Sequence, residues 1–365
     1  MNLLLPIFRL PFRAMEQVSK ALHSIINMIS NRRSNKFPIL RLPFLAIEEI
    51  FKAMDPFEII NFSMTSKRAK IVTKAMVFNS KYVICVFIDT TLGIAINGTK
   101  NRVSCVYEMT SDKQMDGKTE EDKRNRFITR KAFKYSKDPV EEWKQLCKHV
   151  LEIFKKQSID RLTMTMDAFV DHNVSIIDFL RTNVNSVEKC NLWHSEDEND
   201  VDEHAAYFLD KLKVSNELYF YLKIKNDNFN GKIPKNLNEL YLPNSHWIGY
   251  EKLLDIDCKH VVLTNDRIWE EEWNLFIKKW IAMETNQNLE YMELDNRNLD
   301  IFRIHVLYDI PHEVVDDGVK RILKTRFNQN QEFNGGIDIR RIDGKTATLC
   351  VCRIFGMNRF AMRVH

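Results

Sequence analysis

The sequence predicts a chain of mixed class, α+β with α/β character, in which a small all-helical bundle precedes a larger domain of strands and helices. Three observations lead to this prediction. Helical periodicity dominates residues 37–79, strand-like apolar runs dominate 81–109, and short apolar runs alternate with helical segments from 138 to 330. A strand pair is expected at 335–355.

The helical bundle is predicted from apolar spacing and from one helix-start signal. In "LPFLAIEEIFKAM" the apolar positions 47, 50, 51 and 54 follow the i, i+3, i+4, i+7 stripe of one helix face. Asp55 can cap a second helix, Pro56 suits its first position, and Glu58 completes a capping box. "EIINFSM" then gives the second helix and "SKRAKIVTKAM" a basic third helix, whose charges are most simply solvated.

The segment after the bundle changes to the period of strands. "KYVICVFID", "LGIAIN" and "RVSCVYEM" predict three strands within 81–109. Residues 110–130 are polar and of mixed charge, so we expect an exposed, mobile loop. Residues 138–157 predict an amphipathic helix whose apolar face carries Trp143, Leu146, Val150, Ile153 and Phe154.

A loose repeat follows this helix. Six apolar runs recur about every 20 to 30 residues, at 160–169, 186–194, 217–224, 236–245, 258–266 and 288–296. Three of them approach the pattern L-x-x-L-x-L, and helical segments such as 270–283 lie between runs. The degenerate period predicts a leucine-rich-repeat-like strand–helix domain. A C-terminal β-hairpin is expected at 335–355, around the Asp343-Gly344 turn.

Composition argues against several classes of function. The chain has 365 residues with 54 basic and 50 acidic side chains, and the net charge of +4 is too small for a dedicated nucleic-acid binder. No apolar run approaches the roughly 18 to 20 residues that cross a bilayer, so no membrane partner is expected. Seven scattered cysteines and the lack of a signal-peptide pattern favour a reducing compartment, cytoplasmic and/or nuclear.

Sequence patterns for catalysis or metal binding are incomplete. A nucleophile elbow does not surround Ser175, zinc spacing is missing around Cys190, and the acidic run 195–204 lacks the glycine and closing glutamate of a calcium loop. We therefore expect no catalytic residue, no metal and no cofactor. Among Trp247, Trp269, Trp273 and Trp280 most are expected in the core, and an exposed one would be a natural substrate anchor.

Residues 42–68, "LPFLAIEEIFKAMDPFEIINFSMTSKR", resemble an F-box, with Ala69 departing from the tryptophan that many F-boxes carry. The remainder is similar to the F-box-associated type 2 domain that is common in the large nematode F-box family. The residues that carry this second likeness are 237–263, 276–294 and 333–349. The resemblance divides the chain into an N-terminal partial F-box-like duplicate at 1–36, an F-box at 37–79 and an F-box-associated domain at 80–365.

The resemblance implies a function. An F-box of this family binds a Skp-type adaptor and through it a cullin, and the C-terminal domain captures an unknown protein substrate. The chain would then be a non-catalytic receptor subunit of an SCF-type ubiquitin ligase. The adaptor-binding residues expected on this basis are Leu42, Pro43, Ile47, Ile50, Phe51, Met54, Phe57 and Ile60. Tyr241 and Asn265 are the expected substrate-binding positions on the repeat surface.

Two other functions stay open at this point. The protein could bind the adaptor without delivering a substrate, as a competitor or an assembly factor. A hydrolase or transferase in the C-terminal domain is the alternative from a different class. Copurification with adaptor and cullin separates this enzyme from the other two, and ubiquitination of a bound protein separates those two from each other.

The segment at 38–54 has a near-copy at 6–22, with ten of seventeen positions identical. The upstream copy keeps Leu10-Pro11-Phe12 but replaces Phe51 by Ser19 and lacks counterparts of the capping residues. We favour a decayed partial duplication. A second working adaptor site, chance similarity between amphipathic helices and a misassigned protein start are the alternatives.

Overall fold

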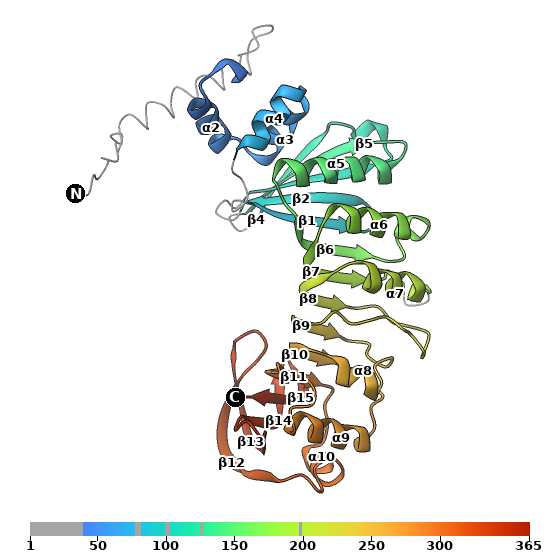
Figure 1. The fold of residues 1–365 in the computed structure, drawn as a ribbon, viewed down its shortest axis with the longest axis vertical. Coiled ribbons are helices and arrows are strands. Elements are labelled where there is room, and N and C mark those ends of the chain that lie inside the picture. Colours follow the sequence, from blue (N-terminus) through green and yellow to red (C-terminus); the bar gives the residue numbers. More distant parts are fainter. Residues whose placement is uncertain (1–38, 77–81, 99–102, 125–126, 197–198) are drawn as a thin grey trace, which may run out of the picture. The chain divides into compact units, whose positions relative to one another are not determined.

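The computed structural model describes residues 39–76, 82–98, 103–124, 127–196 and 199–365 (Figure 1). These residues fall in two compact units, Met1–Phe78 (the helical unit) and Asn79–His365 (the sheet unit). The near-copy at 6–22 lies outside the described residues. Within the described ranges no helix is both long enough and apolar enough to span a membrane.

Within residues 39–76, the helical unit contains a short 3-10 turn and three helices. They are η1 (Ile39–Arg41), α2 (Phe44–Ala53), α3 (Pro56–Met64) and α4 (Lys67–Ala75). The predicted capping box is confirmed: the Asp55 carboxylate accepts the Glu58 N–H and the Glu58 carboxylate accepts the Asp55 N–H, both at 2.9 Å. Both bonds satisfy N–H groups that the start of α3 would otherwise leave unpaired, so the chain turns sharply between α2 and α3.

The apolar stripe of α2 faces the interior. Ile47 and Phe51 are 5% and 2% exposed, and Ile59, Ile60 and Ala69 are fully buried. A small alanine at 69 lets α4 approach its neighbours closely. The three helices therefore form a core of their own, to which the apolar stripe contributes directly.

The sheet unit contains one mixed sheet of fifteen strands in the order β12-β13-β14-β15-β11-β10-β9-β8-β7-β6-β1-β2-β3-β5-β4. Its central strands are β1 (Tyr82–Ile88), β6 (Ser158–Thr165), β7 (Ser186–Trp193), β8 (Val214–Phe220), β9 (Leu237–Leu242), β10 (Cys258–Leu263) and β11 (Tyr291–Leu294). Each of these is parallel to the next.

Helices cover one face of this parallel region. They are α5 (Pro139–Ile153), α6 (Asn173–Asn183), α7 (Asp202–Lys211), α8 (Tyr250–Asp255), α9 (Glu270–Ile281) and α10 (Leu299–His305), with a short η3 (Val170–His172) before α6. Strands β6 to β11 add in one direction, and right-handed crossovers then place successive helices on the same side (Figure 1). Among the described residues of the sheet unit, no helix covers the opposite face of strands β6 to β10, which is called the open face below.

Each of the six predicted apolar runs overlaps one of the parallel strands, from β6 to β11, although β6 and β8 begin before their runs, at Ser158 and Val214. The predicted helix at 138–157 is confirmed as α5, capped by Asp138, with Trp143, Leu146, Val150, Ile153 and Phe154 buried. These findings establish an α+β chain, in which a helical region precedes a mixed sheet with helices. They leave the likeness to leucine-rich repeats as a prediction.

The expectation of a loop at 110–130 is wrong. After β2 (Leu92–Gly98) and β3 (Val103–Thr110), the chain forms η2 (Lys113–Met115), β4 (Thr119–Arg124) and β5 (Phe127–Tyr135). All six β4 residues are exposed, so this edge strand has no apolar alternation for a sequence reading to detect. The β4–β5 ladder and an ion pair between Glu121 and Arg130 at 2.8 Å hold it in place.

The C-terminal hairpin is confirmed and forms part of a larger antiparallel region. Strands β13 (Asn330–Arg340) and β14 (Thr346–Ile354) flank the predicted turn, where Gly344 has a φ of 92°. β12 (His312–Lys324) and β15 (Met357–Val364) extend it, and β15 joins it to β11. The repeat-like region therefore ends before β12, and not at residue 330 as expected, because β12 lies at the far edge of the sheet and the strand beside β11 is the antiparallel β15.

Candidate functional site

The eight adaptor-binding positions expected from the sequence differ in exposure. Ile47, Phe51 and Ile60 are buried, Leu42, Ile50, Met54 and Phe57 are half-buried, and Pro43 is exposed. The buried three belong to the core of the helical unit. Their side chains stabilise the unit and leave direct contact with a partner to more exposed neighbours.

Exposed apolar side chains gather at the start of α2. Phe44 is 54% exposed and Leu45 is 73% exposed, directly after the exposed Pro43. Met64 on α3 and Ile71 on α4 are also exposed, by 50% and 68%. Large, solvent-exposed apolar side chains on a small helical unit are typical of a surface that a partner covers. The apolar stripe at 47–54 could not reveal them, because Phe44 lies one turn before its first residue and Leu45 lies on another face of the helix.

The open face of the sheet carries a group of aromatic rings that we call the aromatic strip: Trp193, Tyr219, Tyr221 and Tyr241. Side chains alternate along β8, so that Leu218 and Phe220 are buried toward the helices while Tyr219 and Tyr221 face the other way. The parallel register of β8 and β9 places Tyr241 beside Tyr219. On the other side of β8, Trp193 at the end of β7 lies beside Tyr221. The predicted substrate position Tyr241 is thus one member of a larger set.

The rings of the strip are packed against each other. Trp193 and Tyr221 stack with centroids 3.7 Å apart, and Tyr221 and Tyr241 lie 5.4 Å apart. Trp193 is 39% exposed and the three tyrosines are half-buried. Burial raises the pKa of both Tyr219 and Tyr221 above the usual value. The strip therefore presents neutral, rigid rings that are partly accessible to a ligand.

Arg326 anchors one end of the strip. It reaches over from the connection between β12 and β13, its guanidinium lies 4.7 Å from the Tyr241 ring centroid, and it pairs with Glu239. Glu293 is a second, longer ion-pair partner at 3.9 Å. Burial raises the pKa of Glu293, an effect that Arg326 and then Arg359 oppose. The charge of Arg326 thus compensates two carboxylates that the sheet buries.

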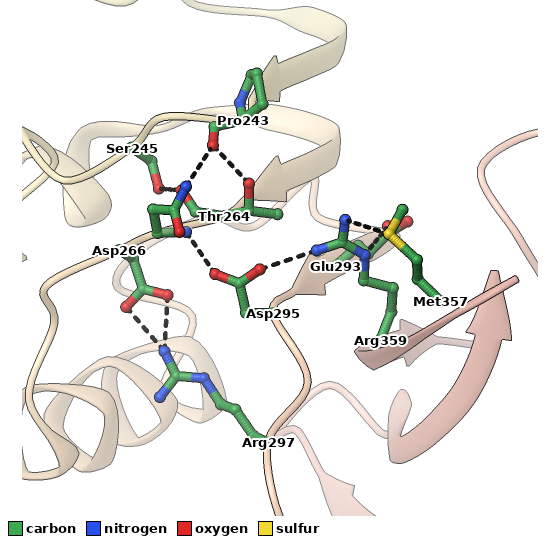
Figure 2. Close-up of polar contacts among 10 residues, drawn as sticks. Pro243, Ser245, Thr264, Asp266, Glu293, Asp295, Arg297, Met357 and Arg359 are labelled. Atoms are coloured by element: carbon green, nitrogen blue, oxygen red, sulfur yellow. Dashed lines mark hydrogen bonds and ion pairs between the residues drawn. The ribbon is translucent and has the colours of Figure 1, made fainter. Parts of the chain in front are cut away.

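Asn265, the other predicted substrate position, is exposed but serves the fold. It adopts a left-handed backbone with φ of 57°, and its amide donates to the Pro243 carbonyl at 3.2 Å. Its backbone N–H donates to Asp295, which also pairs with Arg359 at 2.9 Å (Figure 2). The side chain fixes the turn after β10 against the end of β9, so Asn265 has a structural role.

The four tryptophans considered in the sequence differ in their solvent exposure. Trp247, Trp273 and Trp280 are buried, with at most 3% exposed, while Trp269 is 70% exposed. Trp269 directly precedes α9, in the segment that connects the carboxyl end of β10 to this helix. It is the exposed tryptophan that would suit a substrate anchor.

The residues considered for catalysis and metal binding have structural roles. At the start of the acidic run, the backbone N–H groups of Ser195 and Glu196 donate to the Asp167 carboxylate, and the Ser175 hydroxyl accepts from Lys144. Burial raises the pKa of the Cys190 thiol, which disfavours its thiolate form. Within the described ranges no group of three or more His, Cys, Asp or Glu side chains is placed to hold a metal ion.

Comparison with known proteins identifies two family models in the chain. The model described as "F-box domain" matches residues 39–81, and the one described as "F-box associated" matches residues 228–294. The first contains the exposed apolar start of α2. The second runs from before β9 through β11 and contains Tyr241, Asn265 and Trp269. F-box domains bind Skp-type adaptors within SCF complexes, and proteins of this kind are generally non-catalytic subunits.

One curated protein is similar over part of its length. The E3 ubiquitin-protein ligase hecw-1 of Caenorhabditis elegans is 30% identical over 91 residues, which cover 25% of this chain and 7% of that protein. This chain thus spans only a small share of that relative. No solved structure matches the chain.

Proposed function

Because this chain is an F-box protein that also carries an F-box-associated domain, we propose that it is the substrate-recognition subunit of an SCF-type cullin ubiquitin ligase. In this role the helical unit binds a Skp-type adaptor, which joins it to the cullin. The sheet unit holds a protein substrate. The chain itself supplies binding surfaces and no catalytic group.

The observation that carries the adaptor-binding part is the exposed apolar start of α2 within the F-box match. Pro43, Phe44 and Leu45 are consecutive and exposed. An apolar helix face recognises a partner by filling a groove between the partner's helices, and it needs no titrating group. The half-buried Leu42, Ile50, Met54 and Phe57 would complete the rim of this contact.

The open face supports the substrate-binding part. Tryptophan, tyrosine and arginine are the residues most enriched among the energetically dominant positions of protein interfaces. The aromatic strip with Arg326 has this composition on a face without helices, and Trp269 adds an exposed ring. A broad, shallow surface of this kind suits a protein better than a metabolite, which needs an enclosing pocket.

The seven cysteines support a reducing compartment for this function. None of the seven forms a disulfide in the structure, and six are buried. Free, buried thiols are typical of proteins that work in the cytoplasm or nucleus. We place the ligase subunit there on this ground.

Reconstitution with purified adaptor, cullin and ubiquitin-transfer enzymes tests the proposal. The full chain should join the complex and promote ubiquitin transfer to a protein captured by the sheet unit. Leu45→Glu should prevent assembly, while Leu275→Glu, a matched change at an exposed residue of α9, should not. Assembly without transfer to any bound protein would instead favour the competitor or assembly factor. If Leu45→Glu assembles normally, the assigned surface is wrong.

A further inference from the structure

The sheet unit contains a basic hollow at the carboxyl ends of three neighbouring parallel strands. It has a volume of about 640 Å³ and is lined by Lys223, Ile224, Lys225, Asn244, His246, Asn265 and Arg267. These residues follow β8, β9 and β10 in the chain. The carboxyl edge of parallel strands is where ligands bind in sheets of this type, because the connecting loops there are free to diverge.

The lining of the hollow is positively charged. Lys223, Lys225 and Arg267 contribute three cations, and none of the lining residues is acidic. Arg267 pairs with Asp227 at 2.8 Å, but both side chains are more than 60% exposed. An exposed pair of this kind contributes little energy, so a carboxylate from a partner can replace Asp227 at small cost.

Hydrogen bonds hold the polar walls in position. Asn244 donates to the Tyr221 carbonyl at 3.4 Å, and the Ile224 carbonyl lies 2.6 Å from His246 Nε2, which donates to it. Asp202, a buried carboxylate on the neighbouring α7, accepts the backbone N–H groups of Lys225 and Asn226. The backbone that carries the lysines is therefore fixed before any ligand arrives, which lowers the entropy cost of binding.

The hollow is linked to the aromatic strip through the backbone of Tyr221. Tyr221, whose carbonyl accepts from Asn244 in the hollow wall, stacks on Trp193 in the strip. A protein segment lying across the strip can thus place one side chain on the rings and the next ones among the cations. The two surfaces together discriminate by charge as well as by shape.

We propose that the basic hollow binds acidic side chains, carboxylate or phosphate, of the protein segment that the sheet unit captures. This inference rests on the proposed function, because it names the chemistry of the captured substrate. A nucleic acid fits less well. The hollow is lined by three cations, fewer than the row of phosphate contacts on which nucleic-acid binding depends.

Fluorescence anisotropy with the full chain tests this inference. The probes are labelled peptides of one length that contain a tryptophan followed by four glutamates, four glutamines or four phosphoserines. At low salt the glutamate or phosphoserine peptide should bind at least about fivefold tighter than the glutamine peptide. If the glutamate peptide binds tighter, the preferred anion is a carboxylate, and if the phosphoserine peptide binds tighter, it is a phosphate. Either result supports the proposal. Added salt should weaken the binding of the acidic peptide.

Variants test whether the preference for the acidic peptide arises at the basic hollow. Lys223→Gln with Lys225→Gln, and separately Arg267→Gln, should each remove most of the preference for the acidic peptide. The matched control is Lys213→Gln with Lys235→Gln, at exposed positions before β8 and β9, at the opposite edge of the same strands. Circular dichroism checks that each variant is folded, and Arg267→Gln, at an exposed side chain, keeps the test valid if the lysine pair disturbs the turn.

Three results would overturn the inference: equal binding of the glutamine peptide, equal loss in the control variant, or tighter binding of a single-stranded oligouridine than of either acidic peptide. Adaptor binding, measured on the same preparations, separates this failure from that of the proposed function. If the chain binds the adaptor but not the acidic peptide, only the proposed role of the hollow in binding acidic side chains is refuted. A chain that fails to bind adaptor refutes the function from which this inference starts.

Discussion

Trp193 and Tyr221 stack face to face across two parallel strands, with ring centroids 3.7 Å apart and planes inclined by 11°. The pair belongs to no part of the helix-facing core, and Trp193 is 39% exposed. A stacked, half-exposed pair presents a large flat apolar area whose conformational entropy is already lost. This makes it the best-prepared anchor point on the open face.

Replacing Trp193 by alanine should reduce the capture of protein partners by at least about tenfold, because the ring supplies a large share of the exposed contact area. Trp193→Phe keeps a ring over Tyr221 and should retain most of the binding. Quantitative pull-down with the full chain measures both, and thermal unfolding confirms that the sheet is intact. Full partner recovery with Trp193→Ala would remove the strip from the substrate site.

Replacing Arg326 by methionine should destabilise the sheet unit by about 3 kcal/mol, because the buried Glu239 would lose its cation and Glu293 would keep Arg359, at 3.7 Å, as its ion-pair partner. Urea unfolding followed by circular dichroism measures the change. The double variant Arg326→Met, Glu239→Gln should recover part of the loss, since one uncompensated charge disappears. A single variant as stable as the wild type would show that Arg326 compensates neither carboxylate.

Glu293 should make the sheet unit less stable as pH rises. Burial raises its pKa above the usual value of 4.5, so the folded state holds the proton more tightly than the unfolded state. Stability from this group is complete below pH 4.5 and is lost as pH rises through the raised folded pKa. Comparing unfolding of wild type and Glu293→Gln from pH 4 upward isolates this contribution. Parallel pH profiles for the two proteins would contradict it.

Replacing Asn265 by alanine should destabilise the turn after β10 by about 1 to 2 kcal/mol, because the bond to the Pro243 carbonyl is lost and alanine disfavours a φ of 57°. Asn265→Gly loses the same bond but tolerates that backbone, so it should cost less. Chemical denaturation of both variants gives the comparison. If glycine is the worse substitution, backbone strain does not determine the preference at this position.

Local signals in the sequence predicted much of the fold. The capping residues Asp55 and Glu58 are close in sequence and bond as expected. The apolar runs that became β6 to β11 were visible because each strand buries one face against helices. β4 was missed because an exposed edge strand carries no apolar alternation. Its pairing depends on β5, which a local pattern cannot express.

The candidate sites were harder to predict for a related reason. The apolar stripe of α2 correctly marked a helix, but a stripe identifies the face that the chain itself buries, as Ile47 and Phe51 show. Of the exposed apolar residues at the start of α2, Phe44 lies one turn before that stripe and Leu45 lies off it. Tyr241 was found from its place in a repeat, whereas the stacking of Trp193 on Tyr221 depends on strand register. Register is a property of the assembled sheet and has no signal within one strand.

The central claim is that the exposed apolar start of α2 binds a Skp-type adaptor, and calorimetric titration of purified adaptor into the full chain tests it most directly. Phe44→Ala with Leu45→Ala should weaken binding by about thirtyfold or more, since two exposed anchors are truncated without opening the helical core. Leu275→Ala, at an exposed residue of the sheet unit, should bind like the wild type. Wild-type affinity of the Phe44, Leu45 double variant, with unchanged helix content, would contradict the account.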